Sequence, residues 1–377
     1  MTNKKEISVT RTSLPPFEEY CAAIQPLWES RLMTNMGTLH GQLTDALRNR
    51  FGCGVTLFSH GHLALEAALE VLARRGSEVI TTPFTFVSTV HAIVRRGLTP
   101  VFCDVLPSDG TLDPAGLEAL ITPRTAAILP VHVYGNPCDV DAIDAVARRH
   151  GLPVIYDAAH AFDVRYQDRP LVTFGDASIL SFHATKVFST VEGGAVCYGE
   201  DVAGMPSAEF AVRLDDCKNF GIRDEETCVF PGGNAKLNEL QAAMGLCNLR
   251  HFDEAVAARG RVVTQYIDAL KPLFASGAVS LLLPREGTRP NYAYFPVLFS
   301  SPEARDKAYT ALREAGIHPR KYFWPPVTDT QCYRSARYPG ADDTPVAHDL
   351  SARVLCLPLY DSLTPEDVRR IVRTVAD

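Results

Sequence analysis

A lysine and an aspartate, each following an apolar run, are the residues of this sequence best placed to do chemistry. Lys186 lies in the stretch 178–195, after the apolar pair Ile179-Leu180 and before a double glycine, with small and polar residues around it. A lysine at the end of a buried strand loses solvation, so its pKa falls and the neutral amine, a nucleophile toward carbonyl groups, is favoured. Taken alone, however, the pattern favours a lysine on a surface loop.

Asp157 changes this balance. It ends the apolar run 152–157, one strand earlier in the chain. An acid at a strand end can pair with the pyridinium nitrogen of pyridoxal phosphate (PLP), whose aldehyde forms a Schiff base with a lysine. Lys186 together with Asp157 therefore predicts PLP as the cofactor.

Other residues could surround this cofactor. Gly61 and His62 begin a strong helical pattern, and a helix N-terminus can hold a phosphate, although they could equally form a plain helix start. Phe86 could stack on a flat ring or belong to the core. His160 could bond a phenolic oxygen, orient the aspartate or be structural. Ser181 could donate to the phosphate or satisfy the local backbone.

Several other classes are disfavoured. The sequence contains no G-x-S-x-G, Walker A, G-x-G-x-x-G or H-E-x-x-H pattern, and Leu57 stands where a dinucleotide fingerprint starting at Gly52 needs its third glycine. The ten cysteines occur without C-x-x-C spacing. They indicate reduced thiols rather than disulfides or a metal site.

Length and charge set further limits. The 377 residues suffice for more than one domain. The net charge of −7 argues against nucleic acid as a partner. No signal-peptide h-region and no apolar run of about 18 residues is found, so we expect a soluble, cytoplasmic protein without a membrane span.

Helical and strand patterns alternate through the first half of the chain. Apolar strands separated by amphipathic helices predict a mainly parallel sheet with helices on both faces. Ligands of such sheets bind at the carboxyl ends of the strands, where Asp157, Phe86 and Ser181 are expected. The expected strands are 78–82, 100–104, 126–131 and 154–157, and the expected helices are 61–76, 85–96 and 140–150, with a further helix after Asp113-Pro114.

The pattern changes after Gly233, which indicates a second, smaller domain. One or two long amphipathic helices are expected over 238–273, then strands at 279–283, 292–299 and 354–358, with helices starting at Ser301-Pro302 and Thr364-Pro365. We therefore predict an N-terminal arm (1–30), a large PLP-binding domain (31–245) and a small α+β C-terminal domain (246–377).

Five segments together resemble one known family, the PLP-dependent sugar aminotransferases of the DegT/DnrJ/EryC1/StrS family. The resemblance extends from about Met36 to the C-terminus. It implies an α/β protein with the aspartate aminotransferase-like (type I PLP) fold. The segments are 83–88, 130–135, 157–161, 181–186 with 192–194, and 233–245.

The resemblance implies a role for each residue around the cofactor ring. Lys186 would form the Schiff base and Asp157 would bind the ring nitrogen, which makes these two the catalytic residues. Phe86 would stack on the ring, and His160 stands where relatives have Gln or His near the phenolic oxygen. Dehydratases of the family replace the lysine by histidine, so the resemblance favours a transaminase.

The phosphate end is implied in the same way. Gly61, His62 and Ser181 would surround the phosphate, and Asn234 matches an asparagine that relatives supply across the dimer interface. The resemblance thus implies a homodimer with shared active sites. Two positions depart from the family: His62 replaces a Ser or Thr, and Lys236 replaces an Arg that is common in relatives.

The substrate is implied by a subgroup resemblance. Segment 316–326 replaces the usual His-Tyr-Pro pattern and resembles enzymes that move an amino group from L-glutamate to dTDP-4-dehydro-6-deoxy-D-glucose, giving dTDP-4-amino-4,6-dideoxy-D-glucose for polysaccharide (O-antigen) or secondary-metabolite synthesis. His183, Lys321 and Tyr322 could face this nucleotide sugar or pack the domain junction. Two alternatives stay open: 3-amination of a dTDP-3-keto-6-deoxyhexose, and a non-catalytic PLP-binding regulatory protein.

Overall fold

A central sheet carries the large domain in the computed structural model, which describes residues 6–73, 76–336 and 338–376. Its strand order is β2-β10-β9-β6 followed by β5-β3-β4, and parallel bridges from Ile128 to Val154 and from Val131 to Asp157 join the two parts. All pairs are parallel except those of β10. The strands are β2 (Gly54–Phe58), β3 (Glu78–Thr81), β4 (Thr99–Phe102), β5 (Thr125–Ile128), β6 (Ile155–Asp157), β9 (Ala177–Ser181) and β10 (Gly194–Tyr198).

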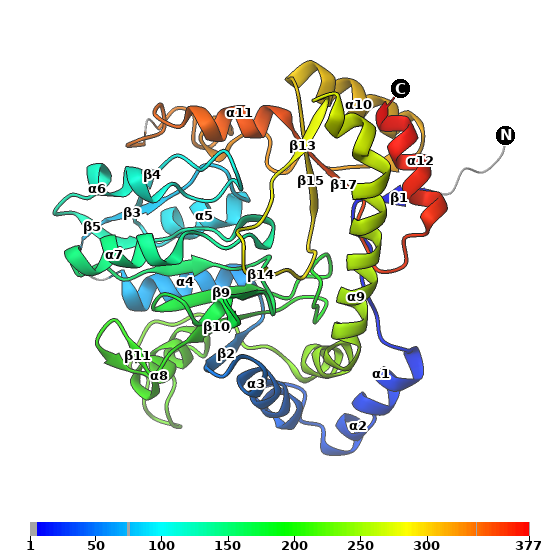
Figure 1. Ribbon diagram of the computed structural model, residues 1–377. Coiled ribbons are helices and arrows are strands. Elements are labelled where there is room, and N and C mark those ends of the chain that lie inside the picture. Colours follow the sequence, from blue (N-terminus) through cyan, green and yellow to red (C-terminus); the bar gives the residue numbers. More distant parts are fainter. Residues whose placement is uncertain (1–5, 74–75, 337, 377) are drawn as a thin grey trace.

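Helices cover both faces of this sheet (Figure 1). Successive strand residues point to opposite faces, so Val79, Ile155 and Ile179 join one core with α4, α5 and α8, while the residue after each joins another core with α3 and α7. This two-sided burial explains why the strands are apolar throughout. The helices are α3 (Thr38–Phe51), α4 (Gly61–Leu72), α5 (Val87–Arg95), α6 (Leu117–Leu120), α7 (Val140–His150) and α8 (Ser207–Lys218).

The expected α/β fold with a mainly parallel sheet is confirmed, and β10 is its antiparallel exception. The element after Asp113-Pro114 differs from the expected helix, because it starts as a short 3-10 turn, Pro114–Gly116, before α6. Asp113 caps that turn as expected. Arg74 and Arg75, at the end of the expected helix 61–76, lie outside the described residues.

A smaller antiparallel sheet, β13-β15-β17, forms the centre of the C-terminal part. Its core also contains residues of α9, α10 and α12. The elements are α9 (Glu239–Ala275), β13 (Val279–Leu281), β15 (Phe295–Phe299), α10 (Pro302–Glu314), β16 (Ile317–His318), α11 (Pro345–Arg353), β17 (Val354–Leu357) and α12 (Pro365–Ala376). Among the described residues, no helix is long and apolar enough to span a membrane.

One helix, α9, runs the full length of both parts (Figure 1). Residues from its start are buried with the large-domain core, and residues from its end are buried with the small-domain core. The domain boundary expected at 245 therefore falls inside this single helix. The segment before α3 packs against the C-terminal part and against α9. Strand β1 (Ile7–Ser8) pairs with β16, and α1 (Phe17–Ile24) packs on α9. Helix α2 (Pro26–Ser30) follows α1.

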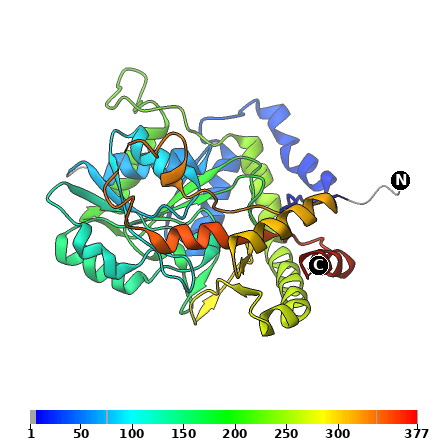
Figure 2. The ribbon, with the colours of Figure 1, turned by 90° about the horizontal axis from the view of Figure 1, so that it is seen from above.

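Helix α11 returns over the large domain, and Figure 2 shows it nearly end to end with α10 across the top of the molecule. The large domain holds its N-terminus, because the carboxylate of Asp104 accepts the N–H groups of Val346 and Ala347 at 2.9 and 2.8 Å. Beneath it, Phe84 from the large domain and Phe323 from the small domain share one apolar core. The two domains are thus joined at the strand ends as well as through α9.

Short strands also pair outside the two main sheets. Strand β7 (Arg165–Tyr166) pairs with both β8 (Arg169–Pro170) and β14 (Thr288–Arg289), and β11 (Asp201–Val202) pairs with β12 (Met205–Pro206).

A buried carboxylate on α9 also fixes the start of α3. Glu239, only 1% exposed, accepts the N–H groups of Leu39 and His40 at 2.8 and 2.9 Å. The residue at the N-cap position of α3, Gly37, has no side chain to do this, and a Cβ there would lie 2.9 Å from the Glu239 carboxylate. The first turn of one helix therefore caps another.

We expect Glu239→Ala to lower the free energy of unfolding by about 2–3 kcal/mol, because two buried N–H groups lose their acceptor. Urea unfolding followed by circular dichroism measures this. The matched control is Glu254→Ala at an exposed position of the same helix, which should change stability by no more than about 0.5 kcal/mol. Equal losses in the two variants would contradict the capping role.

Candidate active site

The carboxyl ends of two neighbouring parallel strands bring together Asp157 and the loop that carries Lys186 (residues 182–193, the lysine loop). Strand β6 ends at Asp157, which pairs in register with Ile179 of β9. Strand β9 ends at Ser181, and the chain then turns sharply, with Lys186 N donating to His183 O at 2.9 Å and Phe182 pairing with Gly193. The topology thus places the two predicted catalytic residues at one edge of the sheet.

The amine of Lys186 lies next to the phenol of Tyr294. The distance from Nζ to the hydroxyl oxygen is 3.5 Å, a long hydrogen bond. Burial lowers the pKa of Lys186 to about 8, and the negative charge of Asp157 opposes this shift. The neutral amine is therefore much more abundant near neutral pH than in an exposed lysine.

Asp157 is enclosed but well bonded. Thr89 donates its hydroxyl to one carboxylate oxygen at 2.7 Å, and Ala159 N donates to the other at 3.1 Å. Burial raises the pKa of Asp157, while these two hydrogen bonds, Lys186 and His62 lower it. A carboxylate has about four lone-pair positions, so it can accept one more donor such as a protonated ring nitrogen.

His160 has a defined tautomer. The N–H of Tyr134 donates to its Nδ1 at 3.0 Å, so Nδ1 is an acceptor and the proton of the neutral ring is on Nε2. Burial keeps the pKa of His160 well below its usual value. The ring stacks on Phe323 with a centroid distance of 5.9 Å and meets the edge of Tyr294 at 4.9 Å. His160 therefore presents a fixed N–H donor.

Phe86 is 55% exposed although it is a large apolar residue. It occupies the N-cap position of α5, directly after the end of β3 and its loop, and its ring centroid is 6.5 Å from that of Phe323. An aromatic face left open beside a polar site can stack on a planar ligand.

The predicted phosphate end is a narrow junction of backbone. Helix α4 begins at Gly61 with no capping side chain. A Cβ on Gly61 would lie 2.9 Å from the Ser181 Cβ, and one on Gly194 would lie 2.4 Å from Gly61 N, so glycine is required at both positions. The side chain of His62 is engaged by Ser88 at 2.8 Å and Glu66 at 3.0 Å. Contact with an anion there falls to the backbone N–H groups of α4.

The predicted substrate residues separate into two groups. The ring of Tyr322 packs against the ring of Tyr294, with 5.7 Å between the ring centroids. His183 Nε2 lies 3.6 Å from Glu192 Oε1, and both residues are on the lysine loop. Lys321, in contrast, pairs with Asp306 of α10 at 2.5 Å, so its ammonium group turns toward the small domain.

Asn234 is the exposed member of the predicted phosphate site. Its side chain accepts a hydrogen bond from Lys236 at 2.7 Å. Between these two residues, Ala235 O accepts the N–H of Ser59 at 2.8 Å, two residues before Gly61.

Three residues of the cluster were missed by the sequence argument. Thr89 follows Phe86 by three positions, so a helical reading would have placed both on one face. Tyr294 was assigned only to a strand, and Phe323 lies next to Tyr322 in the segment that was singled out. Their contacts join residues far apart in the chain, 68 positions for Thr89 with Asp157 and 108 for Tyr294 with Lys186, and no local pattern encodes them.

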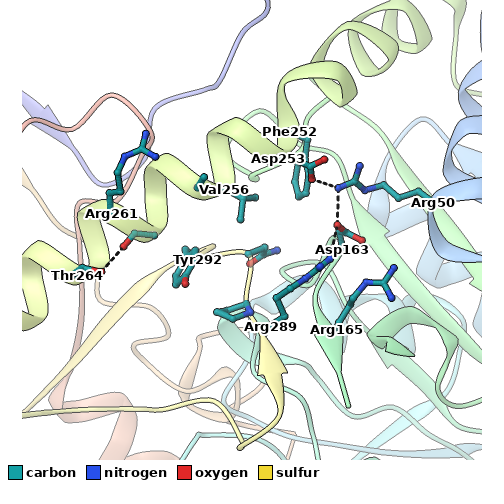
Figure 3. Close-up of a pocket in the computed structure, with 14 residues that line it drawn as sticks. Arg50, Asp163, Arg165, Phe252, Asp253, Val256, Arg261, Thr264, Arg289 and Tyr292 are labelled. Carbon is teal, nitrogen blue, oxygen red and sulfur yellow. Dashed lines mark hydrogen bonds and ion pairs between the residues drawn. The ribbon is translucent and has the colours of Figure 1, made fainter. Parts of the chain in front are cut away.

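A hollow of about 810 Å³ lies elsewhere, between α9 and the strands β7 and β14 (Figure 3). Arg50 pairs with Asp163 at 2.7 Å and also with Asp253, and Arg289 lies 3.6 Å from Asp163. The site proposed from the sequence shares no residue with this hollow. Asn291, whose side chain holds His160 O at 2.9 Å, forms part of its wall.

The chain belongs to the DegT/DnrJ/EryC1/StrS aminotransferase family, which matches residues 18–376. The family expected from the motifs is confirmed, and the chain is an enzyme of the aminotransferase class.

Two curated proteins and one solved structure are similar to this chain over nearly its whole length. The dTDP-4-amino-4,6-dideoxy-D-glucose transaminase of Shigella dysenteriae is 40% identical over 377 residues, 99% of both chains. The Escherichia coli protein of the same name is 38% identical over 375 residues, 98% of both chains. The structure of DesI in the presence of its TDP-sugar product is 31% identical, with a TM-score of 0.90 over 98% of this chain and 92% of that chain.

The lowered pKa of Lys186 predicts a pH profile. With a pKa of about 8, about a quarter of the amine is neutral at pH 7.5, against about one part in a thousand for an unperturbed lysine. Only the neutral form reacts, so labelling of Lys186 in the apoprotein by an amine reagent, followed by mass spectrometry, should rise with a midpoint near pH 8 and level off above about pH 9.

Asp157→Asn should move this midpoint to lower pH, because it removes the charge that opposes the shift. Surface Lys271, which pairs with Asp268, is the internal control in each digest. A Lys186 profile that still climbs steeply above pH 9 would contradict the assignment.

Proposed function

We propose that this chain uses PLP to transfer an amino group from glutamate to the keto group of a nucleotide sugar. The substrate we favour is dTDP-4-dehydro-6-deoxy-D-glucose, and the product is dTDP-4-amino-4,6-dideoxy-D-glucose. The observation that carries the proposal is the Lys186 amine beside a buried Asp157 carboxylate at one strand edge. Two relatives named for this reaction, similar over nearly the whole chain, support the choice of sugar.

The residues at this edge fit PLP. The glycine junction of Gly61 and Gly194 leaves backbone N–H groups open to a phosphate, with Ser181 beside them. Exposed Phe86 offers a face for the ring, and Asp157 has an acceptor position left for the ring nitrogen. His160 Nε2–H is a donor suited to the phenolic oxygen. These assignments rest on the shape and chemistry of the donor set.

When bound, PLP supplies an aldehyde for exchange of amines and a protonated ring that takes up negative charge. Lys186 provides the neutral amine that holds the cofactor. Once a substrate amine has displaced it, Lys186 Nζ would act as the base that takes the proton from the substrate carbon and as the acid that delivers it to the former aldehyde carbon of the cofactor. Asp157 keeps the ring nitrogen protonated, because its charge stabilises the N–H cation.

The sugar would enter beside Tyr322 and His183. Tyr322 packs on Tyr294, which contacts the Lys186 amine, so a group bound near Tyr322 is close to the reacting centre. Lys321 can take part only after leaving Asp306. Its proposed contact with the sugar or its pyrophosphate therefore includes the loss of an ion pair.

A second copy of the chain would complete the site. Asn234 lies in the exposed segment 219–236, which also exposes Phe220, Ile222 and Val229 at 43–49%. An apolar surface of this kind is a candidate protein interface. These residues support a homodimer in which Asn234 of the partner subunit reaches the cofactor phosphate.

The direct test is turnover. Holoenzyme with glutamate and dTDP-4-dehydro-6-deoxy-D-glucose should release 2-oxoglutarate, and NMR of the product should place nitrogen on C4. The 3-keto isomer serves as the parallel substrate. Amination only of the 3-keto sugar would select the alternative enzyme. PLP binding without turnover of glutamate would favour the regulatory protein.

Shared sites predict complementation. Lys186→Ala should bind PLP without a covalent link and should have no activity, and Asn234→Ala should bind PLP weakly. Coexpression of the two variants makes mixed dimers with one intact site each, so about a quarter of wild-type activity should return if subunits pair at random. Activity no higher than the sum of the separate variants would reject the shared site, and turnover by Lys186→Ala alone would reject the mechanism.

A further inference from the structure

Two threonines form a hydrogen-bonded chain that ends at Asp157. Thr85 Oγ1 lies 2.8 Å from Thr89 Oγ1, and Thr89 Oγ1 donates to Asp157 Oδ2 at 2.7 Å. Thr89 is fully buried, Thr85 is 3% exposed and Asp157 is 7% exposed. The three side chains therefore have little contact with solvent, and their hydrogen bonds are made mainly to one another.

The direction of this chain is fixed by counting protons. A hydroxyl has one hydrogen to donate and two lone pairs with which to accept. An ionised Asp157 can only accept, so the Thr89 hydrogen points to the carboxylate and the Thr85 hydrogen points to Thr89. Aligned hydroxyl dipoles of this kind strengthen one another, and bonds to an ionised acceptor are the stronger class.

A protonated Asp157 would fit these threonines less well. Its proton on Oδ2 would turn Thr89 into an acceptor there, and the Thr89 hydrogen would then point to Thr85. Thr85 would need a new acceptor for its own hydrogen, and no other partner of its hydroxyl is found among the described residues. The arrangement therefore favours the charged carboxylate.

The two other side chains that favour the charged form of Asp157, Lys186 and His62, each have another role or partner. Lys186 lowers the pKa of Asp157, as does His62, but the amine of Lys186 is the group that reacts. The ring of His62 is held by Ser88 and by Glu66. Burial opposes these groups, because it raises the pKa of Asp157. The threonine hydroxyls are neutral groups that the reaction leaves unchanged, so they act at every step.

The fold supplies both threonines with one segment. Phe86 takes the extended N-cap conformation of α5, and Thr89 N donates to Phe86 O at 3.2 Å in the first turn. Thr85 lies just before the N-cap residue, and its hydroxyl contacts that of Thr89 in the first turn at 2.8 Å. The segment that carries the open aromatic face thus also carries the donors to Asp157.

We propose that Thr89, with Thr85 behind it, is a positioning residue that keeps Asp157 ionised and aimed at the ring nitrogen of the cofactor. This inference rests on the proposed function, because that nitrogen belongs to PLP. Thr89 touches Asp157 and acts through it, so its removal affects only ligands that use Asp157.

The test compares two ligands that differ in one atom. Apoprotein is titrated in equilibrium dialysis with PLP and with its 1-deaza analogue, in which carbon replaces the ring nitrogen. Thr89→Val keeps the side-chain shape and removes the hydroxyl. It should weaken PLP binding about 10- to 100-fold and leave the affinity for the analogue unchanged. Thr89→Ser should restore PLP binding, and Thr85→Val should give a smaller loss in the same direction.

Thr44→Val is the matched control, since Thr44 is also a buried helical threonine whose hydroxyl donates to backbone, at 2.8 Å to His40 O. It should change neither affinity. Equal losses of affinity for both ligands in Thr89→Val, or no loss for either, would overturn the inference. The proposed function would still stand in that case, provided that the wild-type protein binds PLP. Failure of the wild-type protein to bind PLP would reject both.

Discussion

A carboxylate removed from water is costly unless donors replace its hydration, and the arrangement around Asp157 meets this requirement. Each of its oxygens has a donor, one from Thr89 and one from the Ala159 backbone. The parallel pairing of β6 with β9 places the lysine loop at the same edge. Burial therefore acts on the acid and the amine together, and each charge moderates the effect of burial on the other.

The aromatic residues around this pair come from both domains. His160 from the loop after β6 stacks on Phe323, and Tyr294, just before β15, lies at the edge of the same ring and beside Lys186. A rigid aromatic wall costs little conformational entropy on ligand binding, because its rings are already held by packing. The same contacts fix the His160 tautomer, since the Tyr134 N–H can donate to Nδ1 only while that ring stays in place.

The sequence could predict those parts of the site that follow from strand ends and local motifs. Asp157 closes an apolar run, Lys186 follows another after a short loop, and helix starts such as Gly61 are visible from periodicity. Contacts across the domain junction could not be predicted in this way. The pairing of Lys321 with Asp306 depends on how α10 packs beside the segment after β16, and the Thr89 bond depends on the depth at which α5 meets β6. Single helical continuity of α9 was likewise open, because an amphipathic stretch does not show where a helix is interrupted.

Some features of the fold were more evident from pattern than others. Apolar strands with polar ends predicted the covered sheet, yet β10 runs against its neighbours, since direction leaves no mark on a short apolar run. The start of α3 also lacks a local signal, because its cap, Glu239, comes from 200 residues later in the chain.

The attachment of α11 to the large domain limits how this molecule can admit a ligand. Asp104 holds the first turn of α11, and Phe84 with Phe323 continues one apolar layer from one domain into the other. A wide rotation of the domains would strip a carboxylate of its donors and expose that layer. These contacts disfavour such a rotation, so access to the lysine falls to side chains and short loops near exposed Phe86.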